Sequence, residues 1–307
     1  MSGPGWFVGI DGGGTRTDLA LVDFEGVFVS RLRGATSNRA VVGPDAAIEV
    51  LRSLIDEALD QAGATRPIAA GWIGLAGADR HEDQALFRAA LADRIDSIRI
   101  TNDAELVLSG NPESIGIALI GGTGSIAFAR NEAGVSGRSG GWGHIFGDEG
   151  SAYGLAVNGL RTVAAATDGR GPETSLTESL MDYWQAGTPQ QLISKVYHAA
   201  IRKSDIAASA PVIVNAAREG DSISLQLLES AAFHLASLII SLLHRIPFSS
   251  PPSVAVTGGL LLHVPELREL LRQELRDQPC QDELTMVEDV AVSAAQAIRL
   301  QTMKGGV

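Results

Sequence analysis

Cysteine is almost absent from this 307-residue sequence, in which Cys280 is the single example. One thiol cannot close an internal disulfide, and within one chain it cannot support a cysteine-ligated iron–sulfur cluster or structural zinc site. The six histidines are scattered along the sequence and show no spacing typical of metal ligands. A disulfide scaffold, a structural zinc site and an iron–sulfur cluster are therefore not expected.

Basic residues are also scarce, with 24 lysines and arginines against 36 acidic residues and a net charge of −12. Such a surface repels nucleic acid and anionic membranes, so a polyanionic ligand requires a local site with amide or cationic donors. The longest apolar run, Leu235–Leu243, is interrupted by serines and is too short to span a bilayer. Residues 1–5 lack the basic and apolar segments of a signal peptide. We expect a cytoplasmic protein with no nucleic-acid or membrane partner.

The order of the expected elements is that of a mixed α/β protein. Three antiparallel strands near residues 7–30 precede a helix from Pro44 to Gly63, and strands and helices then alternate. Helices are expected further along at several places in 166–219 and at 222–245, 265–275 and 290–301. No low-complexity linker is present, so we place a compact domain boundary near Asn111 and Pro112.

The segment from Phe7 to Val22 predicts a buried strand, a glycine-rich turn and a second strand. Asp11 stands where the first strand ends, and Gly12-Gly13-Gly14-Thr15 follows it. Glycines let backbone N–H groups approach the oxygens of a ligand, and a carboxylate can hold a hydrated metal ion, which suits a polyphosphate with Mg²⁺. The turn leads into a strand and lacks Gly-Lys-Ser/Thr, so it is neither a P-loop nor a dinucleotide-binding turn. The alternative is a tight hairpin whose glycines supply positive φ angles.

The same pattern occurs a second time. A strand at 115–120, the turn Gly121-Gly122-Thr123-Gly124-Ser125 and a strand at 126–130 repeat the order of the first segment. This self-similarity predicts two duplicated domains that face one another, each with one phosphate-binding turn.

A second glycine-rich stretch covers residues 137–151. Ordering so many glycines is costly unless the loop shape is needed. Asp148 and Glu149 offer hydrogen-bond acceptors and Trp142 offers a flat apolar face, a combination that suits a sugar. In contrast, we expect no chemistry from residues 166–219.

Five blocks in this order resemble one family. They are Ile10-Asp11-Gly12-Gly13-Gly14-Thr15, Thr101-Asn102-Asp103, Gly121–Ser125, Gly140-Gly141-Trp142-Gly143 with Gly147–Ser151, and Thr257-Gly258-Gly259. Together they resemble the N-acetylglucosamine kinase and BadF/BadG/BcrA/BcrD-type ATPase family of the actin–hexokinase–Hsp70 superfamily, over roughly residues 7–260. The resemblance implies an α/β fold of two actin-like (ribonuclease H-like) domains with a mixed central sheet each and a nucleotide cleft between them. Residues 1–112, completed by the helix at 290–304, would form the first domain and 113–289 the second.

The resemblance also implies how ATP and Mg²⁺ are held. The two turns would grip the ATP phosphates from opposite domains, and Asp11 would position the magnesium ion through water. Gly258 and Gly259 would lie against the adenosine, where a side chain would block the base or ribose. The implied ATP-binding set is Gly12, Gly13, Gly14, Thr15, Gly122, Thr123, Gly124, Gly258 and Gly259.

Asp103 resembles the catalytic base of the family. A carboxylate at the C-terminal end of a strand can accept the proton of a sugar hydroxyl as it attacks the γ-phosphate. The alternative is that Asp103 is the N-cap of a short helix at 104–110.

A sugar site is implied by the same resemblance. Its residues would be Asn38, Gly77, Asp103, Gly141, Trp142, Asp148 and Ala152. Asp148 would bond sugar hydroxyls, and Asn38 would bond a hydroxyl or the amide of an N-acetyl group unless it is a plain turn residue. Trp142 would form a loop wall rather than a core aromatic, and Glu149 would orient the loop or reach the metal through water.

The sequence departs from the family pattern in three ways. Ala76 stands where some members carry a hydroxyl, and Ser293-Ala294 stands where a glycine pair is more usual. The dehydratase-activator branch bridges its dimer with an iron–sulfur cluster that takes two cysteines per subunit, and this chain has one.

The function predicted from these residues is an ATP-dependent kinase of an amino sugar. N-acetylglucosamine is the first choice of substrate and glucosamine the second, with the C6 hydroxyl as acceptor. One alternative is an ATPase that drives a conformational change in a partner, and another is a non-catalytic sugar sensor. Similar kinases are commonly homodimers through the second domain, so a homodimer is expected.

Overall fold

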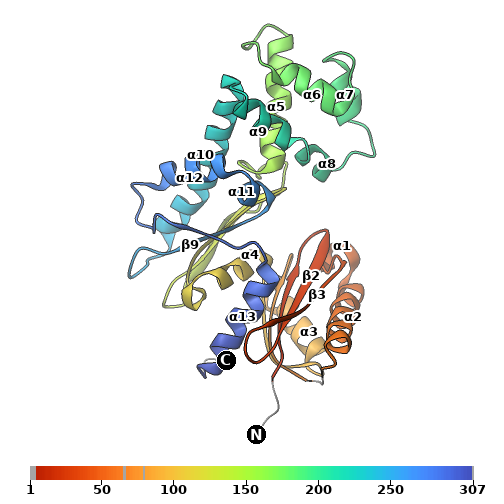
Figure 1. The fold of residues 1–307 in the computed structure, drawn as a ribbon, viewed down its shortest axis with the longest axis vertical. Helices are drawn as coiled ribbons and strands as arrows, with labels where there is room; N and C mark the ends of the chain where they lie inside the picture. Colours follow the sequence, from red (N-terminus) through yellow and green to blue (C-terminus); the bar gives the residue numbers. More distant parts are fainter. Residues whose placement is uncertain (1–4, 65–66, 79, 306–307) are drawn as a thin grey trace. The chain divides into compact units, whose positions relative to one another are not determined.

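The computed structural model describes residues 5–64, 67–78 and 80–305 (Figure 1). The chain divides into two compact units, which we treat separately. Unit 1 comprises residues 1–118 and 285–307, and unit 2 comprises residues 119–284. The expected boundaries at 112 and 289 lie a few residues outside unit 2, in the connections that flank it.

Unit 1 is built on a five-stranded sheet with the order β3-β2-β1-β4-β5. β1 pairs antiparallel with β2 and parallel with β4, while β2 pairs antiparallel with β3 and β4 pairs parallel with β5. The strands are β1 (Phe7–Gly12), β2 (Arg16–Val22), β3 (Phe28–Ala35), β4 (Ile68–Leu75) and β5 (Ile95–Thr101). The predicted mixed sheet, with three antiparallel strands first, is confirmed.

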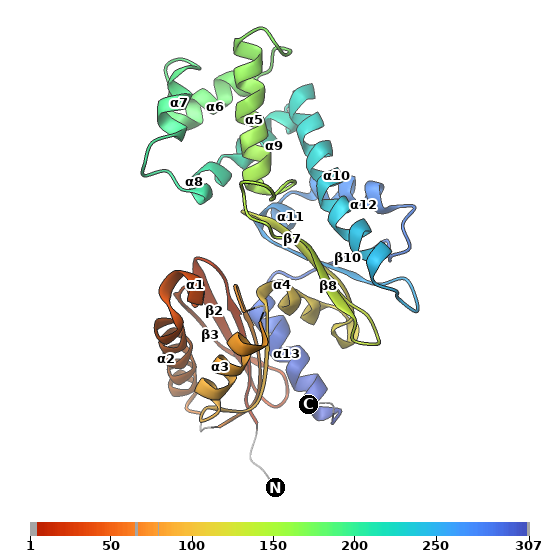
Figure 2. The ribbon, with the colours of Figure 1, turned by 180° about the vertical axis from the view of Figure 1, so that it is seen from behind.

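Helices cover both faces of this sheet (Figures 1 and 2). α2 (Pro44–Ala62) and α3 (His81–Leu91) lie on one face, and α13 (Val290–Met303) lies on the other. α2 begins at Pro44 and ends at Gly63, whose left-handed backbone forms the C-cap. Short elements α1 (Arg39–Val42), α4 (Asp103–Leu106), η1 (Val107–Gly110) and η2 (Pro112–Ser114) complete the unit.

The core of unit 1 lies between the sheet and α2 with α3. Alternate residues of β1 and β2 meet the apolar stripe of α2, as the two-residue period of a strand requires. The fully buried members include Val8, Ile10, Leu19, Leu21, Leu51, Ile55, Phe87 and Leu91.

α13 packs on the opposite face at very close range. A Cβ atom placed on Gly9 of β1 would lie 2.0 Å from the carbonyl oxygen of Ala291 and 2.6 Å from the backbone nitrogen of Ala295. Ser293 forms a hydrogen bond of 3.0 Å between its hydroxyl and that of Ser109. Small residues therefore let the last helix of the chain lie directly on its first strand.

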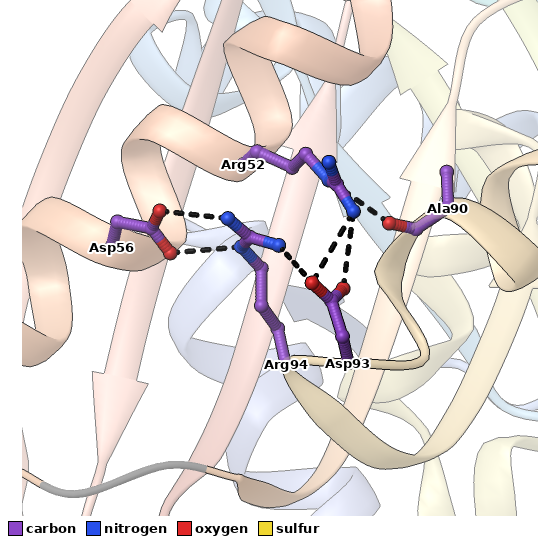
Figure 3. Close-up of polar contacts among 5 residues, drawn as sticks. All are labelled: Arg52, Asp56, Ala90, Asp93 and Arg94. Carbon is purple, nitrogen blue, oxygen red and sulfur yellow. Dashed lines mark hydrogen bonds and ion pairs between the residues drawn. The ribbon is translucent and has the colours of Figure 1, made fainter.

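An arginine pair fixes α2 to the connection between α3 and β5 (Figure 3). Arg94 donates two hydrogen bonds to Asp56 at 2.8 and 2.9 Å and one to Asp93 at 2.6 Å. Arg52 donates to Asp93 at 3.2 Å and to the carbonyl of Ala90 at 3.0 Å. Since the Arg94 side chain is mostly buried and bidentate, this contact is the kind of ion pair that orients neighbouring elements.

Unit 2 repeats the strand order of unit 1. Its five-stranded sheet runs β10-β9-β6-β7-β8, so that each sheet carries a hairpin on one side of its first strand and two later strands on the other. The strands are β6 (Gly116–Gly121), β7 (Ser125–Arg130), β8 (Ser136–Gly140), β9 (Val254–Thr257) and β10 (Leu284–Met286). The predicted fold class, two α/β domains with a mixed sheet each, is confirmed.

The helices of unit 2 are arranged around the long helix α10 and along the segment that follows α5. α10 (Ser222–Arg245) packs against α12 (Pro265–Leu275), α9 (Ala210–Arg218), α5 (Ala152–Thr167) and the β7–β8 hairpin. α6 (Leu176–Trp184), α7 (Gln191–Val196) and α8 (Lys203–Ala207) follow α5, and α11 (Gly259–His263) follows β9. Residues 166–219 are thus mostly helical with loops, as predicted. By length and composition α10 could also cross a membrane, yet here it packs within unit 2.

Candidate functional site

In unit 1, three strands deliver candidate residues to the same edge of the sheet. Because β1, β4 and β5 are parallel, their carboxyl ends lie together. Asp11 is the penultimate residue of β1, Gly77 follows β4 and Asp103 follows β5. A hydrogen bond of 2.7 Å from the Ala76 N–H to the Gly12 carbonyl ties two of these ends directly. The fold therefore brings Asp11, Gly77 and Asp103 to one place.

Asp11 is an electrostatically unusual carboxyl. Burial raises its pKa from 3.8 to about 7, with further contributions from the negative charges of Asp103 and Asp18 and an opposing one from Arg16. Because ionised Asp11 is disfavoured by burial and by neighbouring carboxylates, a bound divalent cation would stabilise its ionised form. In phosphate-transfer sites, one or two carboxylates and several water molecules hold Mg²⁺. Asp11 and Asp103 fit that donor set. Within the described residues no cluster of three or more acidic, histidine or cysteine side chains forms a complete protein-only metal site.

Asp103 does not have the capping role considered for it. The N-cap of α4 is Asn102, whose Oδ1 accepts a hydrogen bond of 2.6 Å from the Glu105 N–H. Asp103 is the first residue of α4, and its Oδ1 accepts a bond of 3.0 Å from the next N–H, that of Ala104. The alternative that Asp103 is an N-cap is therefore wrong.

The glycines of the first turn are not explained by backbone conformation. The turn does join an antiparallel pair of strands, but none of Gly12, Gly13 and Gly14 is among the described residues with positive φ, so positive φ angles do not account for these glycines. A Cβ on Gly12 would collide with Ser37 Oγ at 2.4 Å, whereas one on Gly14 would meet no atom within 4 Å. The Gly13 N–H is bonded to the Arg16 carbonyl at 3.0 Å, and Gly14 and Thr15 are exposed. Neither packing nor backbone conformation therefore requires glycine at position 14.

Asn38 combines a structural contact with a side-chain donor for which the described part of the chain shows no acceptor. Its Oδ1 caps α1 by accepting from the Ala40 N–H at 2.9 Å, as a turn residue would. Its Nδ2 group makes no hydrogen bond with the described residues. Gly77, at φ 79°, lies beside it, since a Cβ there would be 3.2 Å from Asn38 Oδ1. Thr36 in the same loop donates to the Gly13 carbonyl at 2.9 Å, which links Asn38 to the glycine turn.

In unit 2, the second glycine turn is hydrogen-bonded to the start of α5. The Gly122 N–H donates to the Gly124 carbonyl at 3.0 Å, and the Ala152 N–H donates to the Gly122 carbonyl at 2.9 Å. Ser125 donates from its N–H to Asp148 Oδ1 at 3.1 Å and from its hydroxyl to the Glu149 carbonyl at 2.7 Å. Residues 122–125 and 148–152 therefore form one connected structure.

A cavity of about 450 Å³ opens beside this turn, entirely within unit 2. Its lining includes Gly122, Thr123, Ala152, Ser204, Ala207 and Gly259. A Cβ on Gly259 would meet no atom within 4 Å, while a Cβ on Gly258 would lie 2.6 Å from the Gly121 backbone. Gly258 thus owes its lack of a side chain to backbone packing, and Gly259 is the glycine that faces the open space.

Trp142 lies on the surface of the glycine-rich loop. Its side chain is 60% exposed, which excludes the core-aromatic alternative. The guanidinium of Arg138 stacks over the indole at 4.8 Å, and the Phe146 ring lies 6.1 Å away. Gly141 has a φ of 70°, and its N–H donates to the Ser125 carbonyl at 3.0 Å. The start of this loop is therefore hydrogen-bonded to the end of the glycine turn at residues 121–125.

One charged residue of this site was not found from the sequence. Lys203, the first residue of α8, places its Nζ 2.5 Å from Asp148 Oδ2. Asp148 is 4% exposed and adopts a positive φ of 64°. Its buried carboxylate accepts hydrogen bonds from the Ser125 N–H and from Lys203. No local pattern could indicate this pair, because the two residues are 55 positions apart and Lys203 falls in the segment from which no chemistry was expected.

Comparison with known proteins gives a consistent result. The model of the BadF/BadG/BcrA/BcrD ATPase family matches residues 8–295. An N-acetylmuramic acid/N-acetylglucosamine kinase of Clostridium acetobutylicum is 32% identical over 275 residues, which cover 88% of this chain and 90% of the relative. An N-acetyl-D-glucosamine kinase of Dictyostelium discoideum is 34% identical over 287 residues, with the same coverage. Among solved structures, a candidate N-acetylglucosamine kinase from Chromobacterium violaceum aligns with a TM-score of 0.74 at 25% identity, covering 96% of this chain and 99% of that one.

Proposed function

The chain belongs to the BadF/BadG/BcrA/BcrD ATPase family, and from that premise we propose that it phosphorylates the C6 hydroxyl of an amino sugar with ATP. It is a sugar kinase of the N-acetylglucosamine kinase type. We place N-acetylglucosamine first among its substrates and glucosamine second, in line with what the relatives are named for.

The observation that carries the proposal is the pair of carboxylates at the carboxyl edge of the unit 1 sheet. Asp103 acts as the base that takes the proton of the attacking sugar hydroxyl. Asp11, whose pKa is raised to about 7 by burial and by the negative charge of Asp103, holds the hydrated Mg²⁺ that belongs to ATP. When bound, this ion supplies positive charge to the phosphate oxygens.

The two glycine turns supply the phosphate contacts. Gly12, Gly13, Gly14 and Thr15 act from unit 1, and Gly122, Thr123 and Gly124 act from unit 2. The open space at Gly14 and the cavity next to Gly122 and Gly259 support these roles, and we assign the cavity to the adenosine. A volume of about 450 Å³ is within the range of small-ligand pockets.

Sugar contacts are assigned to the polar groups near these turns. The Nδ2 of Asn38, which has no acceptor among the residues that the structure describes, is assigned as a donor to a hydroxyl or to the carbonyl of an N-acetyl group. Trp142 offers an exposed flat face, and Asp148 offers hydroxyl acceptors. Gly77, Gly141 and Ala152 shape the backbone around them. Glu149, whose carbonyl accepts from Ser125, orients the loop. The homodimer and the cytoplasmic location expected from the sequence stay predictions.

The test is a coupled assay of ADP release with and without a panel of hexoses and amino sugars. We expect turnover that depends on an amino sugar and that falls by roughly 10²-fold or more in Asp103→Asn. The matched control is Asp96→Asn, which removes an exposed carboxylate from the same strand, β5, and should leave turnover unchanged. ADP release that needs no sugar would favour the ATPase alternative. Sugar binding without turnover would favour the sensor.

A further inference from the structure

We propose that Lys203 is a ligand of the ATP phosphate chain, and that it exchanges its contact with Asp148 for a phosphate oxygen when nucleotide binds. This inference rests on the proposed function, because it takes the turn at residues 122–124 as a phosphate site. It assigns a role to a part of the chain, residues 166–219, in which the sequence shows no motif.

The first argument is distance. A Cβ placed on Gly124 would lie 2.6 Å from Asp148 Oδ1 and 3.1 Å from Lys203 Nζ. The ammonium group therefore lies beside the last glycine of the turn, where a Cβ at position 124 would clash with its partner Asp148. A phosphate held by the N–H groups of this turn would be within reach of the lysine side chain.

The second argument is the position of α8. The helix that begins with Lys203 also provides Ser204 and Ala207 to the 450 Å³ cavity lined by Gly122 and Gly259. One short helix thus supplies both a wall of the cavity and a cation next to the turn. A nucleotide with its base in this cavity and its phosphates on the turn would pass along α8.

The third argument is the state of the cation. The Lys203 side chain is 30% exposed, while that of its partner Asp148 is 5% exposed. An ammonium group has three donors, and among the described residues Asp148 is its hydrogen-bond acceptor, with the Tyr153 ring 5.8 Å away. Lysine binds phosphate as a compact point charge. Donors therefore remain for a phosphate oxygen on the solvent side.

Exchange of partners would also affect Asp148. In the structure Oδ1 accepts from Ser125 and Oδ2 accepts from Lys203, so both oxygens are engaged. When Lys203 turns to a phosphate oxygen, Oδ2 becomes an acceptor for a sugar hydroxyl. Bound nucleotide should then raise the affinity for sugar, and by thermodynamic reciprocity sugar should raise the affinity for nucleotide.

The primary test measures the binding of ATP, ADP and adenosine by calorimetry without sugar. Since hydrogen bonds to charged groups contribute about 1.5–3 kcal/mol, Lys203→Gln should weaken ATP and ADP binding roughly tenfold or more and leave adenosine unchanged. Lys203→Arg should recover part of the loss. Lys195→Gln removes the same charge from α7 and should bind all three ligands as the unmodified protein does. Unchanged ATP affinity in Lys203→Gln, or an equal loss for adenosine, would overturn the proposal.

A second measurement covers the case in which Lys203→Gln does not fold because Asp148 is left buried without its partner. The chain has three lysines, Lys195, Lys203 and Lys304, so amine acetylation of the unmodified protein can be followed at each by mass spectrometry. Saturating ATP should slow acetylation of Lys203 severalfold, while adenosine should not. The other two lysines serve as internal controls. Equal rates at Lys203 with and without ATP would contradict the proposal.

These results separate the inference from the proposed function. A protein that binds ATP and protects Lys203 but transfers no phosphate to any sugar would contradict the kinase and support the lysine. A protein that phosphorylates an amino sugar while Lys203→Gln keeps full ATP affinity would support the kinase and contradict the lysine.

Discussion

Two neighbouring glycines in the first turn show how one residue type meets different physical requirements. Gly12 is enclosed, because an added Cβ would lie 2.4 Å from Ser37 Oγ and 2.6 Å from a methyl of Leu75. Gly14 is open, because an added Cβ would meet nothing within 4 Å. The first glycine is required by packing within unit 1. We attribute the second to the phosphate chain.

We therefore expect Gly12→Ala and Gly14→Ala to differ in kind. Gly12→Ala should destabilise the protein by roughly 2 kcal/mol or more, since the overlap forces the neighbouring strand and loop apart. Gly14→Ala should melt within about 1 °C of the unmodified protein but raise the KM for ATP severalfold. Thermal melting and ATP titration of both variants check this. A Gly14→Ala protein with normal ATP affinity would remove the first turn from the nucleotide site.

Asp11 gives a prediction about pH. Its pKa is raised from 3.8 to about 7, so the folded chain holds this proton more tightly than the unfolded chain. Stability from the protonated carboxyl is fully present below pH 3.8 and is lost as the pH rises through about 7. Asp11→Asn, which stays neutral, should therefore gain several degrees of melting temperature over the unmodified protein between pH 5 and pH 8.

The control is Asp277→Asn, which removes a carboxylate from an exposed position and should change the melting temperature little. Millimolar Mg²⁺ should stabilise the unmodified protein more at pH 8 than at pH 5, because the ionised carboxylate binds the cation. A melting difference for Asp11→Asn that is constant with pH would contradict the assigned environment.

At the scale of elements, Asp221 joins two parts of unit 2. Its Oδ1 caps α10 by accepting from the Ser224 N–H at 2.7 Å, and its Oδ2 accepts from the Ser175 N–H at 2.9 Å in the segment before α6. Burial alone would raise the pKa of Asp221, but hydrogen bonds from Ser224, Ser175 and Thr174 outweigh burial and hold the pKa at about 2.

Asp221→Ala should cost about 1–2 kcal/mol of stability, or several degrees of melting temperature. Because the lowered pKa favours the ionised form in the folded state, this stability is present above pH 3.8 and is lost as the pH falls toward about 2. Asp221→Asn keeps a capping oxygen without the charge and should fall between the two. Melting curves at pH 7 that coincide for all three proteins would rule out this role.

Elements with strong local signals were predictable from the sequence. Pro44 and Gly63 delimit α2, and α10 and α12 have the predicted bounds, because their apolar periods run for several turns. The elements that were missed are short. β10 has three residues and α11 has five, which is too few for a period to emerge.

In the candidate site, too, residues within local motifs could be predicted from the sequence, and residues placed by long-range packing could not. Residues within glycine motifs, such as Gly14, Gly124 and Asp11, could be named from spacing and resemblance. Lys203 could not, because its position depends on packing between α8 and a loop 55 residues earlier. The sequence also could not show which of Asn102 and Asp103 is the N-cap of α4, because both residue types are common at that position. The structure shows that the N-cap is Asn102.

At the scale of the whole molecule, the repeated glycine turns indicated duplication, and the two sheets share one strand order. The repeat alone did not indicate how unit 1 is completed, whereas the family resemblance implied that the helix at 290–304 completes it. Its sheet carries α13 across β1, and at Gly9 the backbone of that helix leaves no room for a side chain. The first strand and the last helix of the chain are thus parts of one packed structure.

That contact has a consequence for biosynthesis. Unit 2 is continuous in sequence, whereas unit 1 needs residues 290–303, which follow unit 2 in the sequence. Until those residues are synthesised, the face of β1 that α13 covers lacks its packing partner. Unit 1 therefore completes its folding only after unit 2 has been synthesised, and its exposed apolar face is the kind of surface that chaperones protect.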